Sequence, residues 1–136
     1  MILAVCIDDR NGMLFNGRRQ SQDRVLREDL VREAGGGPLW MNAYSARQFD
    51  PPPEGLRTAE DFLEQAGPGE VCFLETEDPA AWADQAEGLI VYRWNRKYPA
   101  DCHFPLDLEA RGWRLEETED FAGSSHEKIT EEVYVR

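Results

Sequence analysis

The sequence is poor in the residues that build metal centres and disulfide frameworks. It has two histidines, His103 and His126, far apart in the chain, and three cysteines with no CxxC pair. A structural zinc site needs four Cys or His ligands, and an odd number of cysteines does not make a disulfide framework. We therefore expect free cysteines, a cytoplasmic location and no metal site beyond loose binding of a divalent ion by carboxylates.

Long apolar runs and excess positive charge are also missing. The apolar run from Met1 to Ile7 ends at Asp8, far short of the ~20 residues that a membrane span needs. We expect a buried strand there, and neither a membrane helix nor a signal peptide. The 15 basic residues against 27 acidic ones give a net charge of −12. Such a chain repels phosphate groups, which argues against general nucleic-acid binding and against anionic membranes.

What remains is an ordinary globular composition, 41% hydrophobic and 31% charged, in alternating strand-like and helix-like segments. The pattern predicts strands over 2–7, 38–41, 71–74 and 88–94, helices over about 22–34, 42–49, from Thr58 onward and over 80–86, an irregular segment over 50–56, and closing strands over 112–119 and 128–136. This order predicts one α/β domain over residues 1–136. Its sheet should be mixed and mainly parallel, with about six strands, flanking helices and a C-terminal antiparallel hairpin.

Several short motifs occur in the order of one known family. Val5, Asp8, Gly12 and Met13 follow a V-x-x-D-x-x-x-G-M spacing, and further segments are ADCHFP at 100–105, GW at 112–113, GSSH at 123–126 and VYVR at 133–136. Together they resemble dihydrofolate reductase, whose corresponding segments are a G-D-T-H-F-P turn, a D-W strand start, an N-S-H loop and the closing strand. The resemblance implies a dihydrofolate reductase-like sandwich.

The departures from that family lie at its cofactor site. The resemblance places a Gly-Gly turn under the cofactor diphosphate, directly after the strand at 71–74, where this chain has Glu75-Thr76 and two further acids. A G-R-[HK]-[ST] helix start is here NAYS at 42–45, without the arginine, and two strands are missing between 49 and 58. We therefore expect no cofactor and no NADPH-dependent reduction.

The resemblance also implies a remodelled substrate site. The family holds its pterin with a carboxylate, for which Asp23 is the nearest match, and the threonine that partners this carboxylate aligns with Tyr92. Arg24 and Arg27 take positions at which the family has hydrophobic residues that line the pocket.

A second resemblance concerns the stretch FNGRRQSQDRVLRE at 15–28. It is similar to small bacterial proteins, some of which are labelled ribonuclease Z. That class binds two zinc ions through a cluster of histidines and acids, which two distant histidines cannot supply.

The arginine-rich loop before the first helix is the strongest candidate site. Between Arg18 and Arg27 four arginines stand against one acid, Asp23, and arginine side chains beside a helix N-terminus bind anions. In the resembled fold this loop packs against the loops that precede the last strands. We therefore predict ligand-binding residues Arg18, Arg19, Gln20, Ser21, Asp23, Arg24, Trp40, Asn42, Ser125 and His126, with Asp23 and His126 as candidate catalytic residues.

Three functions fit these observations. The first is binding of a small anionic or nucleotide-like ligand on a scaffold without reductase activity. The second is an enzyme with new chemistry in the same cleft, a hydrolase or nuclease with Asp23 or His126 as its acid or base. The third is a divergent reductase of a pterin or related substrate that uses another hydride source. Neither the identity of the ligand nor the oligomeric state follows from the sequence.

Overall fold

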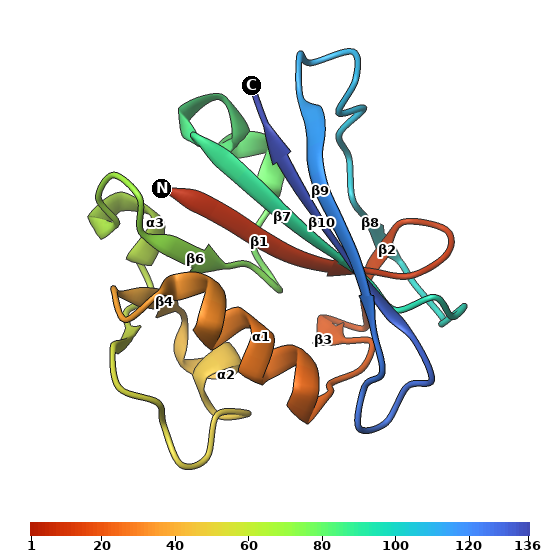
Figure 1. Ribbon diagram of the computed structural model, residues 1–136, viewed down its shortest axis with the longest axis horizontal. Helices are drawn as coiled ribbons and strands as arrows, with labels where there is room; N and C mark the ends of the chain where they lie inside the picture. The colour runs from red at the N-terminus through yellow and green to blue at the C-terminus, as the bar shows by residue number, and fades with distance from the viewer.

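The computed structural model describes residues 1–136 as an α/β sandwich around a seven-stranded sheet (Figure 1). The strand order is β5-β4-β6-β1-β7-β10-β9. The first five run parallel, and β10 and β9 add an antiparallel hairpin at the edge. The strands are β1 (Ile2–Ile7), β4 (Leu39–Met41), β5 (Leu56–Thr58), β6 (Val71–Phe73), β7 (Gly88–Arg93), β9 (Arg114–Phe121) and β10 (Ile129–Val135). The predicted fold class is confirmed.

Smaller elements complete the fold. A second sheet, in the order β3-β2-β8, joins β2 (Gly12–Phe15), β3 (Arg18–Arg19) and β8 (Cys102–His103). The helices are α1 (Arg24–Ala34), α2 (Ala43–Ala46) and α3 (Phe62–Gln65), with short 3₁₀ turns at Pro79–Ala81 and Ala83–Gln85. None of these helices combines the length and the apolar character that a membrane-spanning segment requires.

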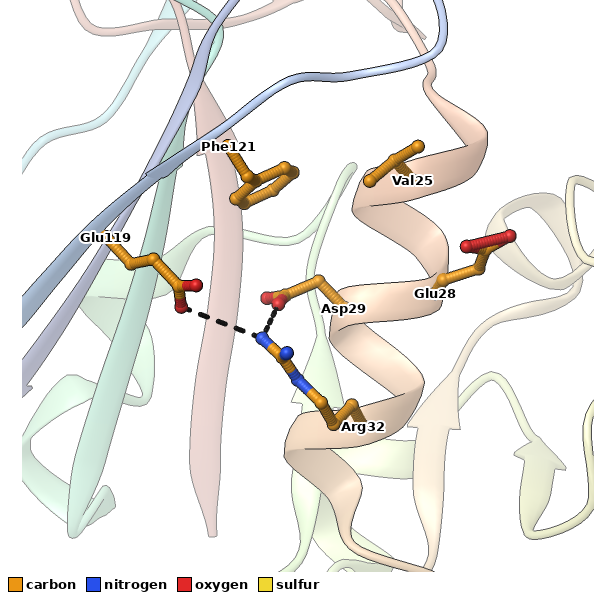
Figure 2. A pocket seen from close by; sticks show the side chains of 6 residues that line it. All are labelled: Val25, Glu28, Asp29, Arg32, Glu119 and Phe121. Carbon is orange, nitrogen blue, oxygen red and sulfur yellow. Dashed lines mark hydrogen bonds and ion pairs between the residues drawn. The ribbon is translucent and has the colours of Figure 1, made fainter.

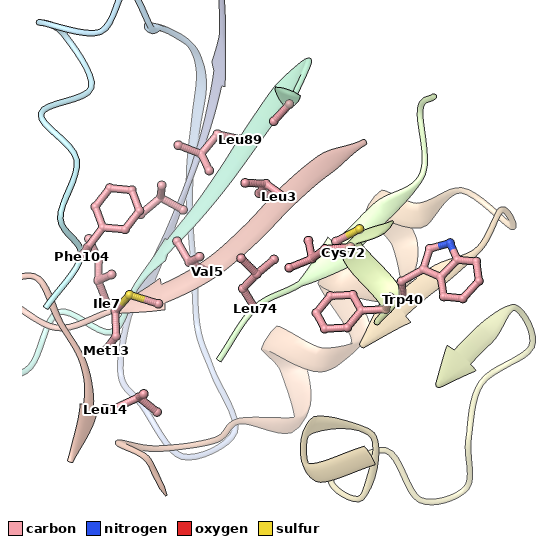
Figure 3. Close-up of a cluster of buried hydrophobic side chains, with 14 of the residues drawn as sticks. Leu3, Val5, Ile7, Met13, Leu14, Trp40, Cys72, Leu74, Leu89 and Phe104 are labelled. Carbon is pink, nitrogen blue, oxygen red and sulfur yellow. The ribbon is translucent and has the colours of Figure 1, made fainter. Parts of the chain in front are cut away.

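Apolar side chains cover both faces of the large sheet. Successive side chains of a strand point to opposite faces, so Leu3, Val5 and Ile7 of β1 join one cluster and Ala4 joins the other. Figure 3 shows the first cluster, in which residues of the large sheet meet Met13 of β2 and Phe104, which directly follows β8. The helices α1 and α2 cover the other face. Coverage of both faces explains why the parallel strands read as continuous apolar runs.

Capping residues set the ends of α1. The carboxylate of Asp23 accepts hydrogen bonds from the backbone N–H groups of Val25 and Leu26, and Gly35 ends the helix in the left-handed conformation with φ 61°. Such a cap residue lies just outside the helix, so α1 begins at Arg24, two residues later than predicted.

Three other predicted elements differ in length or kind. Thr58 ends strand β5, which pairs with β4 and becomes the seventh strand, so the helix predicted from Thr58 begins only at Phe62. The helix predicted over 42–49 is a single turn, although Asn42 does cap it. The segment predicted as a helix over 80–86 forms the two 3₁₀ turns instead. Periodicity cannot fix such short elements, because each spans one turn or less.

The carboxyl ends of the parallel strands meet at one edge of the sheet, and polar residues follow them there. Asp8 comes directly after β1, Asn42 directly after β4, and Glu75 two residues after β6; all three are buried. His126 precedes the antiparallel β10 and therefore reaches the same edge. Open α/β sheets bind ligands outside this edge, so we expect a functional site there.

Replacement of Leu30 by alanine tests the packing of α1 on the sheet. Leu30 is fully buried, and removing its side chain should lower the free energy of unfolding by about 2–5 kcal/mol through lost burial and a cavity. Leu115→Ala, at a position 48% exposed, is the matched control and should change it by about 0.5 kcal/mol or less. Urea unfolding measures both free energies. Equal effects of the two substitutions would contradict the packing of this face of α1 on the sheet.

Candidate functional site

A buried histidine–aspartate pair lies where the start of α1 meets the loop before β10. Nδ1 of His126 is 2.9 Å from Oδ2 of Asp23, and the two side chains are 2% and 0% exposed. A carboxylate only accepts hydrogen bonds, so we assign the proton to Nδ1, whose N–H donates a hydrogen bond to Asp23. The indole of Trp94 stacks on the imidazole with ring centroids 4.5 Å apart. The ring of His126 is therefore fixed in position and tautomer.

The carboxylate of Asp23 has every lone pair engaged by the chain itself. Besides His126 and the two N–H groups at the start of α1, the backbone N–H groups of Ser124 and Ser125 donate to it at 3.0 and 2.7 Å. Burial by itself would raise the pKa of Asp23, but the bonds from His126 and these backbone groups outweigh it and hold the pKa well below its usual range. A Cβ at Gly123 would overlap Oδ2 of Asp23, so the loop needs glycine at this position.

The second ring nitrogen of His126 faces two hydroxyl groups. Nε2 is 3.0 Å from Oγ of Ser21 and 2.9 Å from the hydroxyl of Tyr98. With the proton on Nδ1, the single lone pair of Nε2 accepts a hydrogen bond from one of these two hydroxyl groups at a time. Ser21, His126 and Asp23 thus stand in the order of a nucleophile, a base and the group that orients the base. We call Ser21, Asp23, Trp94, Tyr98 and His126 the histidine cluster.

A second buried group surrounds Glu75, which is 8% exposed. Nε and one terminal nitrogen of Arg19 bind its two carboxylate oxygens at 2.9 and 3.1 Å, a bidentate arrangement that is strong in a protein interior. Oγ of Ser45 and the amide of Gln48 donate to the same carboxylate at 2.7 and 3.1 Å. The guanidinium of Arg19 also stacks on the ring of Tyr44, 4.2 Å from its centroid. We call these five residues the arginine cluster.

A pocket of about 370 Å³ opens beside both clusters. Its lining residues, which define what we call the loop pocket, are Phe15, Asn16, Arg18, Arg19, Gln20, Tyr98 and Pro99. Arg18 is exposed and its side chain takes part in no hydrogen bond or ion pair, and Phe15 is 46% exposed. Nε2 of Gln20 donates to Asp8 at 3.0 Å, whereas its buried carbonyl oxygen has no partner. An unsatisfied buried acceptor is costly, by about 1–3 kcal/mol.

Most of the residues predicted from the sequence as ligand-binding come together. Ser21, Asp23 and His126 are in direct contact, and the backbone of Ser125 bonds to Asp23. Arg18, Arg19 and Gln20 line the adjoining pocket. As the resemblance implied, the arginine-rich loop also reaches the turn at Asp101, which accepts a hydrogen bond from the backbone of Asn16.

Three of the predicted residues point elsewhere. The side chain of Arg24 is 63% exposed and pairs with Glu28 on the same helix. Trp40 packs in the core and donates its indole N–H to Glu70. The amide of Asn42 donates to the side chains of Thr76 and Glu77. None of the three side chains contacts the histidine cluster or lines the loop pocket.

Sequence reasoning did not select five important members of the site. Asp8 and Glu75 follow predicted strands closely, so their position at the carboxyl edge was a usable signal. Tyr98 and Tyr44 gave no such signal, because they lie in segments without periodicity. Trp94 ends the apolar strand predicted over 88–94, a position typical of a core residue; it is buried, yet it also covers the face of His126.

Comparison with known proteins bears on the fold. No protein-family model and no curated protein matches this chain. Among solved structures, the dihydrofolate reductase from Enterococcus faecalis complexed with NADP(H) and RAB-propyl is similar over 100% of this chain and 96% of that chain, with a TM-score of 0.68 and 14% sequence identity. At this identity the likeness concerns the fold alone, which is dihydrofolate reductase-like. It gives no support to the resemblance to ribonuclease Z.

Replacement of Asp23 by asparagine tests the histidine cluster. Removing one partner of a buried pair should lower the free energy of unfolding at pH 7 by about 3–5 kcal/mol. Because the folded-state pKa of Asp23 is lowered, its contribution is present above the unfolded pKa of about 4 and is lost as the pH falls below that value. The difference between the two proteins should therefore shrink from pH 4 downward.

Urea unfolding between pH 7 and pH 3 measures this difference, and the exposed Asp9→Asn is the control for the loss of one charge. An Asp23→Asn protein as stable as the unmodified chain at pH 7, or a difference that grows in acid, would contradict the account.

Proposed function

We propose that the protein binds a small anionic, nucleotide-like ligand in the loop pocket and does not catalyse NADPH-dependent reduction. The observation that carries the proposal is the composition of this pocket. An arginine without an acidic partner, Arg18, stands beside two aromatic side chains, Phe15 and Tyr98, in a molecule with 27 acidic residues.

The chemistry of the lining matches such a ligand. The guanidinium of Arg18 offers the planar pair of donors that binds a phosphate or carboxylate group. Phe15 and Tyr98 present aromatic surface on which a flat heterocycle can stack. The carbonyl oxygen of Gln20, which lacks a partner, would accept an N–H of the ligand after a small shift of the loop. The volume of about 370 Å³ lies within the range for small-molecule sites.

Two features support the absence of reductase activity. The nearest match to the pterin-binding carboxylate, Asp23, already accepts five hydrogen bonds from the chain, so it has no free lone pair for a substrate. This disfavours a divergent reductase with another hydride source as well. The Enterococcus reductase is complexed with NADP(H), whereas the place after β6 is here filled by the side chain of Glu75 and its ion pair with Arg19.

Titration calorimetry with AMP, adenosine and inorganic phosphate tests the ligand class. AMP should bind more tightly than adenosine or phosphate, because only AMP offers both the heterocycle and the anion. Arg18→Ala should weaken AMP binding by about 1.5–3 kcal/mol, the contribution of a hydrogen bond to a charged group. Arg114→Ala removes one exposed positive charge on β9 and should leave the affinity unchanged.

NADPH and dihydrofolate complete the same titration series. Neither should bind with a dissociation constant below ~10 μM, about −6.8 kcal/mol. Tight NADPH binding, or equal losses in Arg18→Ala and Arg114→Ala, would overturn the proposal.

A second candidate function has its own observation, the order Ser21–His126–Asp23. In this alternative Nε2 of His126 removes the proton from Ser21 as its Oγ bonds to the carbonyl carbon of an ester. The same proton then passes to the departing alcohol, and water releases the acid from Ser21 in a second round. Asp23 stabilises the protonated ring throughout. Ser21 is half-buried and lines a separate small cavity together with Arg19 and Gln20, which also line the loop pocket.

A fluorophosphonate probe distinguishes this alternative from simple binding. If Ser21 is an activated nucleophile, the probe should label it covalently, and both Ser21→Ala and His126→Asn should abolish the label. Ser125→Ala, in the neighbouring loop, should label as the unmodified protein does. Intact-mass and peptide mass spectrometry measure the adduct, and the absence of labelling at Ser21 would exclude the hydrolytic function.

A further inference from the structure

A row of acidic side chains crosses the antiparallel edge of the sheet, away from the loop pocket. Glu131 of β10 lies directly opposite Tyr92 of β7 on one side and Glu119 of β9 on the other. Asp29 of α1 faces this row and accepts a hydrogen bond from the hydroxyl of Tyr92 at 2.7 Å. Like charges directly opposite one another on adjacent strands destabilise a sheet. Something other than packing must therefore favour this arrangement.

The carboxylate of Glu131 is the least satisfied group in the row. Glu131 is 3% exposed, and its Oε2 atom is buried without a hydrogen-bond partner. One carboxylate oxygen from each of Asp29, Glu119 and Glu131 lies within 4.8 Å of the others. The three acids thus converge on one place, where the chain leaves a buried acceptor without a partner.

One basic side chain partly offsets this charge. Arg32 donates to Asp29 and lies 3.7 Å from Oε2 of Glu119, but its side chain is 62% exposed. Figure 2 shows Arg32 reaching from α1 between Asp29 and Glu119. Being exposed, Arg32 can turn outward into water at little cost. Arg32 therefore pairs with Asp29 and Glu119 but forms no ion pair with Glu131.

We propose that Asp29, Glu119 and Glu131 form a binding site for a hard divalent cation of the size of Ca²⁺, which ties α1 to the β9–β10 hairpin. Carboxylate oxygens are the ligands that such cations prefer, at 2.3–2.6 Å for Ca²⁺. Two ligands on opposite sides of the ion then lie about 4.6–5.2 Å apart, so three oxygens that lie within 4.8 Å of one another can reach the same ion.

The surroundings provide access for the ion and room for water ligands. An open pocket of about 230 Å³ leads to Asp29 and Glu119, with Val25 and Phe121 at its sides. Ca²⁺ takes six to eight oxygen ligands, so water from this pocket would complete the set. Residues 29, 119 and 131 are far apart in the sequence, so only the fold brings these three acids together.

Calorimetric titration of chelator-treated protein with CaCl₂ tests the site. We expect one ion per chain with a dissociation constant of the order of 10⁻⁴ to 10⁻³ M, as in weak calcium sites. Glu131→Gln should weaken binding at least about tenfold. Glu119→Gln should act in the same direction, and because Glu119 is 57% exposed this variant keeps its fold. Glu109→Gln, an exposed acid between β8 and β9, is the matched control and should bind normally.

Substoichiometric Mn²⁺ then locates the ion by paramagnetic broadening of amide resonances. Broadening centred on residues 29, 119 and 131, and lost in Glu131→Gln, supports the proposal. Broadening spread over the acidic surface would mean diffuse attraction to the net charge, and this result overturns it. So would the absence of calcium binding up to 5 mM, which would leave a proton shared by Asp29 and Glu131 as what relieves their repulsion.

Discussion

The buried pair of Asp23 and His126 is the interaction on which the rest of the site depends. Asp23 caps α1, holds the backbone of the loop before β10 and fixes the tautomer of His126. One carboxylate therefore joins a helix, a loop and a ring that are about one hundred residues apart in sequence. Its five hydrogen bonds offset the free-energy cost of burying the negative charge in the interior. They also remove it from any role as a free receptor for substrate.

The same principle governs the other buried acids at the carboxyl edge of the sheet. Asp8 accepts bonds from backbone groups and from Gln20, and Glu75 is paired with Arg19 and two polar side chains. In a molecule of net charge −12, each buried carboxylate needs donors, and most of the unusual polar residues serve this need. What is left for a ligand lies just outside, where the side chain of Arg18 has no internal partner and the ring of Phe15 is exposed.

Much of the fold was predictable from the sequence because its larger elements carry strong local signals. The apolar runs of β1 and β7 and the capped, glycine-ended α1 can each be recognised alone, and the ordered motifs connect them into a known architecture. Strand β5 and the small sheet were not predictable, since strands of two to four residues are too short to show a hydrophobic period. Their position depends on β4 and β2, which supply the hydrogen bonds.

The candidate site was predictable only in part, because its pairings join distant residues. From the sequence alone, Arg19 is a candidate for ligand binding and Glu75 an acid at the expected cofactor position, whereas in the fold each satisfies the other across 56 positions. Likewise Nε2 of His126 lies beside the hydroxyl of Ser21, 105 positions earlier in the chain, and beside the hydroxyl of Tyr98. Residue types and local spacing identify such groups, but only the topology decides which of them meet.

The central claim is that the carboxyl edge is occupied by the chain's own side chains and that a ligand binds beside it. Mapping the amide chemical-shift changes in a ¹H–¹⁵N spectrum during addition of AMP tests this most directly. The account predicts the largest changes at residues 15–20 and 98, with small changes at Thr76 and Glu77 after β6. Largest changes at residues 75–78 and 42–45 would place the ligand where the resembled reductase family holds its cofactor, and would contradict the account.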